Sequence, residues 1–180
     1  MGYPVDVIGI AEQKASAQRF LRYNYYPRVP HMWSDIASLR KTGGHCFICN
    51  RTCKRSTKRP HLSTGGFPCP PFSAARKKTG STRRTGAPQE HPQFNLVMND
   101  LVEYLVRVRP HMFWLEEVAG FVIALDVLGG RSPAAVLAER CRTAGYSVRA
   151  VLLDHRVWLR NSRLRVFVVG ADQDAGGDEA

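Results

Sequence analysis

Runs of apolar residues alternate with polar, turn-forming segments along the chain, and their spacing predicts strands and helices in turn. Short runs rich in β-branched and aromatic residues are typical of buried strands, whereas apolar residues at three- and four-residue intervals indicate one face of a helix. Because the predicted strands alternate with helices, the pattern predicts an α/β sandwich around a mainly parallel sheet. Strands are predicted at 5–12, 61–66, 111–118, 147–153 and 163–171, and helices at 12–27, 94–110 and 131–146. Residues 31–44 predict the end of a strand followed by a short turn of helix.

The helix at 131–146 carries the clearest boundary signals. Ser132 is a typical N-cap, Pro133 suits the first helical position, and Gly145 ends the pattern. Residues 41–60 show no period and predict a loop, and the Gly-, Pro-, Ser- and Thr-rich residues 72–92 predict a second, mobile surface loop.

Charge is distributed unevenly along the sequence. The net charge is +11, no acidic residue stands between Asp35 and Glu90, and twelve Lys or Arg residues fall from Arg40 to Arg84. A block of one sign attracts polyanions, of which nucleic acid is the commonest. A solvated basic loop without a partner is the alternative.

Other features restrict the compartment. No apolar run approaches the roughly 20 residues that span a bilayer, and the first residues lack a basic region ahead of an apolar stretch. Three of the five cysteines lie within eight residues, which does not suit a secreted disulfide framework. We therefore expect a soluble, intracellular protein with reduced thiols and no membrane partner, nuclear if its source is eukaryotic.

The stretch TGGFPCPPFS places one cysteine among three prolines, directly after two glycines. Proline fixes φ and glycine permits unusual backbone shapes, so these residues would hold Cys69 in one pose after the strand predicted at 61–66. Glu12, Asp35 and Glu116 also follow predicted strands. Ligands of open α/β sheets gather at the carboxyl ends of strands, so the four residues predict a site on one rim.

Several motifs resemble, in the family's order, those of the C5-cytosine-specific DNA methyltransferases. GFPCPPFS (66–73) resembles the family's P-C-Q-P-F-S motif, WLEEVAGF (114–121) its E-N-V element, and NSRLRVFVVG (161–170) its Q-x-R-x-R element. The resemblance covers nearly the whole chain and implies a Rossmann-like, S-adenosylmethionine-dependent methyltransferase fold, incomplete at both ends. Further similarities lie in AEQKASAQRFLRYNYYP, SDI and AGYSV.

The sequence also departs from the family pattern. It shows neither the F-x-G-x-G-G loop that holds the methionine part of the cofactor nor a target-recognition region, which a partner chain or further segments would supply. Glu117 stands where the family has asparagine, and Asn161 where it has glutamine. We expect a partial catalytic domain at 1–171, with a basic loop at 40–60 and a catalytic loop at 66–90, before an acidic, disordered tail at 172–180.

The resemblance implies a role for four residues in catalysis. Cys69 would be the nucleophile that adds to C6 of cytosine, and Glu116 would hold the base at N3. Of Arg163 and Arg165, one would contact the base or its phosphate and the other would support the site. The structural alternatives are a packed cysteine, a glutamate at a helix N-terminus and a solubilising pair of edge-strand arginines.

The resemblance further assigns residues to the cofactor and to DNA. Glu12 would accept hydrogen bonds from the ribose of S-adenosylmethionine, Asp35 and Ile36 would flank its adenine, and Pro68 would line the same pocket. The target cytosine must be flipped out of the duplex, and the catalytic loop would close over the DNA. Its residues expected to contact DNA are Ser73, Arg76, Lys77, Lys78, Arg83 and Arg84.

Two other functions remain open at this stage. A catalytically inactive methyltransferase fragment could still bind nucleic acid through its basic loops. The segment HCFICNRTCKR offers His45, Cys46, Cys49 and Cys53 as zinc ligands, and His61 is an alternative fourth ligand. A loop with incidental thiols is the simpler interpretation.

Overall fold

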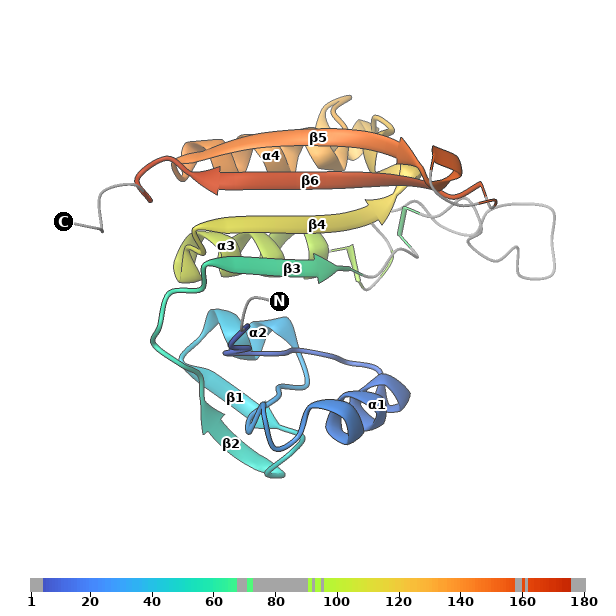
Figure 1. The fold of residues 1–180 in the computed structure, drawn as a ribbon. Coiled ribbons are helices and arrows are strands. Elements are labelled where there is room, and N and C mark those ends of the chain that lie inside the picture. The colour runs from blue at the N-terminus through green and yellow to red at the C-terminus, as the bar shows by residue number, and fades with distance from the viewer. Residues whose placement is uncertain are drawn as a thin grey trace. The chain divides into compact units, whose positions relative to one another are not determined.

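The computed structural model describes residues 5–67, 71–72, 91, 93–94, 96–157, 160 and 162–175. The chain divides into two compact units, Met1–Pro60 and His61–Ala180. Figure 1 shows the helices and strands of each unit, coloured from the N-terminus to the C-terminus.

The first unit is built around two helices and a small hairpin. It contains α1 (Ala15–Tyr25), α2 (Ile36–Arg40), β1 (Gly43–Cys46) and β2 (Arg51–Lys54). The segment expected as a strand at 5–12 forms only a single parallel bridge, between Ala11 and Trp33. Trp33 is buried and donates its indole N–H to the carbonyl of Cys53 at 3.2 Å, so one aromatic side chain joins these segments.

The loop predicted at 40–60 is in part wrong, because β1 and β2 form an antiparallel hairpin there. Strands of four residues are too short to show a period in the sequence. The hairpin depends on close backbone packing at Gly43, where φ is 140° and a Cβ atom would lie 2.1 Å from the Cys53 carbonyl oxygen. Only glycine fits such an approach.

The second unit contains a four-stranded sheet in the order β3-β4-β6-β5. Its strands are β3 (Leu62–Gly66), β4 (Met112–Val118), β5 (Tyr146–Asp154) and β6 (Leu164–Asp172). The prediction of a mainly parallel sheet is wrong: β3 and β4 are parallel, whereas β4–β6 and β5–β6 are antiparallel. The fold is therefore α/β with a mixed sheet.

The connection between β5 and β6 explains this difference. A crossover to a parallel strand needs a dozen or more residues and usually a helix. Residues 155–163 are fewer than that, and the described part of the link holds only a short 3₁₀ turn, His155–Val157. The chain therefore returns beside β5 in the opposite direction.

Helices pack on one face of this sheet, as Figure 1 shows for α3 (Val102–Val108) and α4 (Pro133–Thr143). A π-helical segment, Leu96–Leu101, precedes α3 within the helix predicted at 94–110. Short 3₁₀ segments occupy Ala119–Val122 and Asp126–Leu128. The predicted cap of α4 is confirmed, since Ser132 Oγ accepts a hydrogen bond from the Ala135 N–H at 3.2 Å.

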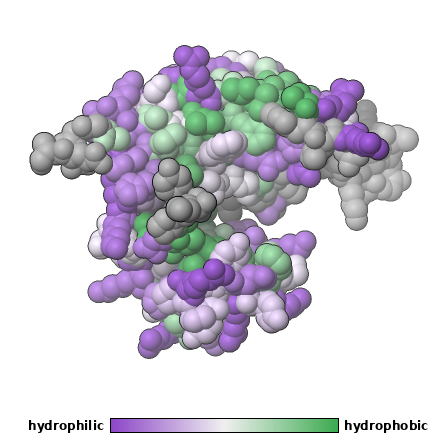
Figure 2. Space-filling model, viewed as in Figure 1, coloured by the Kyte–Doolittle hydropathy of each residue, from purple (hydrophilic) through white to green (hydrophobic). Residues whose placement is uncertain are grey.

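The core of the second unit lies between the sheet and these helices. In β4 the side chains of Phe113, Leu115 and Glu117 are buried on the helix side, and those of Trp114 and Glu116 lie on the other face. Figure 2 shows apolar surface over β5, where Val151 and Leu152 are exposed. Other buried core residues are Leu105, Leu137, Cys141, Tyr146, Val166 and Val168.

Asp172, placed by the sequence at the start of a disordered tail, is the last residue of β6 and is buried. Its carboxylate accepts two hydrogen bonds from the guanidinium of Arg109, at 2.7 and 3.0 Å. This pairing raises the pKa of Arg109 above its ordinary value, because Asp172 stabilises the charged guanidinium. The pair joins the end of α3 to the end of β6.

Candidate functional site

Three residues that the sequence nominated from distant segments meet at one end of the sheet. Glu116 Oε1 accepts a hydrogen bond from Arg165 Nε at 3.0 Å and lies 3.5 Å from a guanidinium nitrogen of Arg163. The Arg165 side chain is 21% exposed and that of Arg163 54%, so the first contact is the better shielded from solvent.

Strand register explains this meeting. Val118 and Arg165 are paired residues of the antiparallel β4–β6 ladder, so Arg165 stands two positions from Glu116 on the same face of the sheet. Arg163 immediately precedes β6 and reaches the same carboxylate. Both arginines thus contact the same carboxylate, although Arg163 lies just outside the strand in which alternation would place the two on one face.

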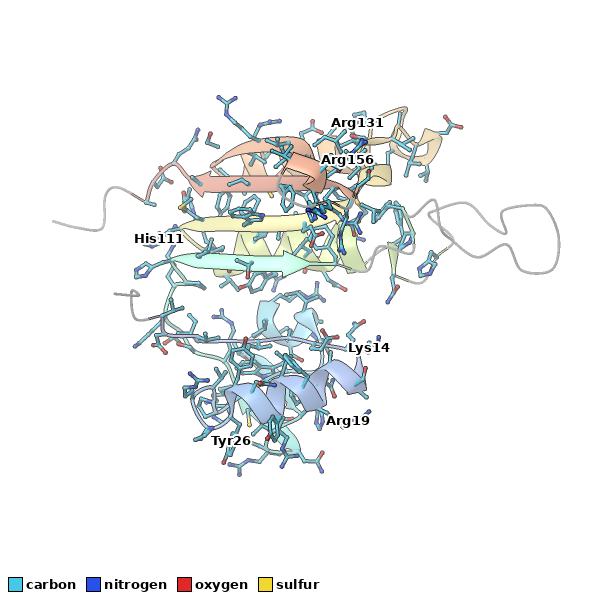
Figure 3. All side chains as sticks on the ribbon, turned by 45° about the vertical axis from the view of Figure 1, so that its right-hand side comes forward. Lys14, Arg19, Tyr26, His111, Arg131 and Arg156 are labelled. Carbon is cyan, nitrogen blue, oxygen red and sulfur yellow. The ribbon has the colours of Figure 1, made fainter. Side chains whose placement is uncertain are left out.

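Asp154, at the end of β5, holds the turn that carries Arg163. Its carboxylate accepts hydrogen bonds from the backbone N–H of Arg156 at 3.0 Å, the backbone N–H of Arg163 at 3.1 Å and the hydroxyl of Ser162 at 3.2 Å. Led by the Arg156 backbone N–H, these bonds lower the pKa of Asp154 from 3.8 to about 2. Figure 3 labels Arg156 after β5, at the opposite end of the sheet from His111 before β4.

Sequence reasoning missed Asp154, although a carboxylate directly after a predicted strand was the signal that had selected Glu116. Aromatic residues also line this face. Trp114 packs edge-on against Phe167, with ring centroids 5.8 Å apart, and His155 stacks on the same Phe167 ring at 6.4 Å.

The strand β3, which leads to the Pro-Cys-Pro segment (residues 68–70), ends beside Glu116. Gly66, the last residue of β3, is the register partner of Glu116 in the parallel β3–β4 ladder. Cys69 follows Gly66 by three residues. The sequence therefore leaves only a short length of chain between the register partner of the carboxylate and the nominated nucleophile.

Two phenylalanines fix both flanks of the Pro-Cys-Pro segment in the core. Phe67 and Phe72 are buried, and their rings lie 5.9 and 5.0 Å from that of Phe121. Phe72 also lies against Phe94, at 5.8 Å. At Gly120 a Cβ atom would stand 1.8 Å from the Phe72 carbonyl oxygen, so this approach requires glycine.

The remaining residues nominated for this site fall outside the described residues. They include the proposed nucleophile, one residue of the cofactor pocket and the DNA contacts: Cys69, Pro68, Ser73, Arg76, Lys77, Lys78, Arg83 and Arg84.

Within the first unit, the residues nominated for the cofactor lie near one another. The backbone N–H of Trp33 donates to the Ile10 carbonyl at 2.8 Å, and the Trp33 carbonyl accepts from the Glu12 N–H at 3.0 Å. Glu12 and Asp35 therefore follow neighbouring, parallel segments. Asp35 is also the N-cap of α2 and accepts from the Ser38 N–H at 2.7 Å. Ile36 is the first residue of that helix.

A second cluster gathers sulfur and imidazole ligands in the first unit. Ligand atoms of His31, Cys46, Cys49 and Cys53 all lie within 4.8 Å of one another. His45 is not in this group: it is exposed and neighbours Cys46 in β1, so its side chain points to the opposite face. His61 belongs to the second unit, where it packs against His111.

Backbone geometry favours an ionised sulfur in this cluster. Burial raises the pKa of the Cys46 thiol, but hydrogen bonds with the backbone of Cys49 and Met32, the side chain of His31 and the backbone of Ile48 outweigh burial and lower the pKa to about 7.

The whole arrangement defines a class of protein: a mixed α/β sheet with a carboxylate and two arginines beside the strand that leads to a Pro-Cys-Pro segment. Comparison with family models then identifies it. The C-5 cytosine-specific DNA methylase model matches residues 4–178, and the chain belongs to this family.

Two curated bacterial relatives match parts of the chain. The Type II methyltransferase M.BspRI of Lysinibacillus sphaericus is 31% identical over 133 residues, which are 72% of this chain and 28% of that protein. M.BsuFI of Bacillus subtilis is 30% identical over 112 residues, 62% of this chain and 24% of its own length. The chain thus matches about a quarter of these relatives.

Solved structures share the fold at low sequence identity. A structure described as a DNA modification methyltransferase encoded within an Escherichia coli prophage aligns with a TM-score of 0.61 and 17% identity, over 97% of this chain and 42% of that one. A DNMT2 mutant of Spodoptera frugiperda aligns with a TM-score of 0.55 and 11% identity, over 93% and 43%. Among the described residues, no helix has the length and apolar character needed to cross a membrane.

Proposed function

We propose that this chain forms part of a DNA (cytosine-5-)-methyltransferase that transfers a methyl group from S-adenosylmethionine to C5 of cytosine. The observation that carries the proposal is the contact of Glu116 with Arg163 and Arg165, opposite Gly66 at the end of the strand that leads to Cys69.

Cys69 supplies the covalent chemistry in this proposal. Its thiolate forms a bond to C6 of cytosine, and the ring electrons move to C5, which becomes nucleophilic. S-adenosylmethionine, when bound, supplies an electrophilic methyl group to that carbon. A base then removes the C5 proton, the C6–S bond breaks, and the thiolate returns.

Glu116 holds the opposite edge of the base. Its carboxyl group hydrogen-bonds at N3 and the exocyclic amino group, and sharing a proton at N3 stabilises the charge that develops when sulfur adds. Arg165 fixes the orientation of this carboxylate, since it is the shorter and more shielded contact. Arg163, more exposed, contacts the flipped nucleotide or its phosphate.

Residues of the first unit fit a cofactor with a ribose and an adenine. Glu12 Oε1 accepts a hydrogen bond from the Lys14 N–H at 2.7 Å, and a carboxylate has about four acceptor positions, so it can also accept from ribose hydroxyls. Asp35 accepts at Oδ1 from Ser38 and presents its other oxygen towards Ser34. Glu12, Asp35 and Ile36 would hold the ribose and adenine of S-adenosylmethionine.

DNA binding in this proposal depends on cationic side chains after Cys69. Ser73, Arg76, Lys77, Lys78, Arg83 and Arg84 contact phosphates and close over the extruded base. Phosphate contacts give affinity that falls with salt and carries no sequence preference. Target recognition is left to a segment other than these residues.

A second candidate is a catalytically inactive fragment that still binds nucleic acid. It is supported by the twelve Lys or Arg residues from Arg40 to Arg84, a stretch without an acidic residue that attracts nucleic acid without requiring catalysis.

Calorimetric titration with S-adenosylmethionine separates the two candidates. The methyltransferase proposal predicts saturable binding near one molecule per chain, weakened in Glu12→Ala and unchanged in Glu139→Ala, a variant of an exposed glutamate on α4. Absence of saturable binding, with DNA affinity retained, would favour the inactive fragment.

A further inference from the structure

Four potential metal ligands come together in the first unit, three from the β1–β2 hairpin and one from the segment that contains His31. His31 Nδ1 lies 3.4 Å from Cys49 Sγ and 3.9 Å from Cys46 Sγ, and Cys53 Sγ completes a group whose atoms lie within 4.8 Å of one another. These four cysteine and histidine side chains play no part in the methyl-transfer proposal.

The distances between these ligand atoms suit a metal ion in tetrahedral coordination. With metal–sulfur bonds of about 2.3 Å and metal–nitrogen bonds of about 2.0–2.1 Å, ligand atoms of a zinc site stand roughly 3.5–3.8 Å apart. The two His31 distances fall close to this range. One central ion could therefore reach these atoms with only small movements of the side chains.

The hairpin arranges the three sulfurs. Cys46 ends β1, Cys49 lies in the turn, and Cys53 is the only buried residue of β2. Asn50 adopts φ of 52°, the left-handed conformation that turns the chain back into β2.

The fourth ligand comes from outside the hairpin. Trp33 pairs with Cys46 in an antiparallel bridge, and the Phe47 N–H donates to the Met32 carbonyl at 2.9 Å. These contacts bring the segment that contains His31 alongside the end of β1. Cys46 and Cys53 are buried and His31 and Cys49 half-buried, so the group is shielded without being closed to an entering ion.

We propose that His31, Cys46, Cys49 and Cys53 bind one Zn²⁺ as a structural Cys₃His site. Three thiolates and an imidazole in a closed tetrahedron are typical of structural zinc, because a catalytic site keeps one position for water or substrate. Disulfide formation between two of these cysteines is the competing state, although all three are free thiols here.

The small core of the first unit explains what the ion does. Its buried apolar residues are only Val29, Met32, Trp33, Leu39, Cys46 and Cys53 among the residues described. Small folding units with so little buried apolar surface commonly rely on a metal or on disulfides. The ion would fix His31 two residues before Trp33, whose backbone pairs with Ala11 and so positions the segments that carry Glu12 and Asp35.

Metal analysis of the full 180-residue chain tests the site directly. The proposal predicts about one zinc per chain after purification, and an X-ray absorption spectrum fitted by three sulfur and one nitrogen neighbours. Cobalt in place of zinc should give the visible spectrum of a tetrahedral thiolate complex. The proposal would be overturned if the purified chain contained no zinc and showed no measurable affinity for added zinc.

Two matched pairs of variants assign the ligands. His31→Ala should lower zinc affinity by more than the roughly 10- to 100-fold that loss of an outer-shell partner costs, whereas His45→Ala should leave it unchanged. Cys49→Ser should likewise lose zinc, and Cys141→Ala, which alters a buried thiol of α4, should keep it.

A further variant guards against simple misfolding. His31→Cys replaces one ligand by another and should retain zinc with four sulfur neighbours in the absorption spectrum. Equal zinc content in His31→Ala and wild type would exclude His31, and four sulfur or two nitrogen neighbours in the wild type would exclude the Cys₃His assignment.

Discussion

Gly66 and Glu116 face each other across the parallel β3–β4 ladder. The pairing places a carboxylate held by two arginines beside the end of the strand that leads, three residues later, to Cys69. The residues that flank the Pro-Cys-Pro segment, Phe67 and Phe72, pack on Phe121. Phe121 follows Glu116 by five residues, so β4 and the turn after it carry the carboxylate and the anchor of the cysteine segment together.

Glu116→Gln should abolish most methyl transfer with little loss of stability. An amide cannot share a proton at N3, and a general acid–base group contributes about 10²- to 10⁴-fold to rate. The side chain is 37% exposed and its ion pairs lie near the surface, so stability should fall by no more than about 1 kcal/mol. Methyl incorporation and thermal unfolding measure the two effects. Glu139→Gln is the control, and a Glu116→Gln variant with wild-type turnover would remove this residue from the mechanism.

Substitution of the two arginines should affect different steps, with Arg165 acting on turnover and Arg163 on DNA binding. Arg165→Ala removes a shielded, charge-assisted hydrogen bond of about 1.5–3 kcal/mol, which corresponds to roughly a 10- to 100-fold lower kcat if the bond orients Glu116. Arg163→Ala removes a longer, more exposed contact and should chiefly weaken DNA binding. Single-turnover rates and DNA titrations distinguish the two effects. A reversed pattern would exchange the two roles.

Gly120→Ala should disturb the anchor of the cysteine segment. The new methyl group would collide with the Phe72 carbonyl, and overpacking of this kind costs about 1–3 kcal/mol. Methyl transfer should fall by more than the loss of folded protein explains, because Phe72 holds one flank of the segment that contains Cys69. Gly65→Ala is the matched control, since its Cβ would make an ordinary 3.5 Å contact with Leu115. Denaturant unfolding of both variants tests this, and equal stability would show that the loop yields without cost.

Particular residues show how far the sequence alone could predict this molecule. The strands 147–153 and 163–171 and the α4 cap were predicted because their signals are local: apolar runs, and Ser-Pro before a helix. Strand direction depends on the connection, and the link at 155–163 is shorter than a parallel crossover needs.

Non-local contacts account for what the sequence missed at the sites. Glu116, Arg163 and Arg165 could be nominated together because each lies in a motif of the family. His31 has no such signal: it approaches the cysteines only through backbone pairing of Trp33 with Cys46, which no spacing in the sequence reveals. His45, adjacent in sequence, was nominated instead, and strand alternation turns it away.

Asp154→Asn should reveal a pH-dependent contribution to stability. The folded-state pKa of Asp154, about 2, lies below its ordinary value of 3.8, so the ionised carboxylate stabilises the folded state. The contribution is present above pH 3.8 and is lost as the pH falls towards 2. Wild type should therefore be more stable than the variant at pH 5 to 7, and the difference should shrink below pH 3.8 and vanish only below about pH 2. Urea unfolding across this range tests the sign, and a difference that grows with acidity would contradict it.

Covalent trapping on DNA that contains 5-fluorocytosine tests the central claim most directly. After sulfur adds at C6 and the methyl group is transferred, fluorine at C5 cannot leave as a proton does, so the C6–S bond persists. With saturating S-adenosylmethionine, we predict an adduct that survives denaturing electrophoresis and maps by mass spectrometry to Cys69, while Cys69→Ser binds DNA equally well but gives none. No adduct from the wild-type chain, or an adduct that persists in Cys69→Ser, would contradict the account.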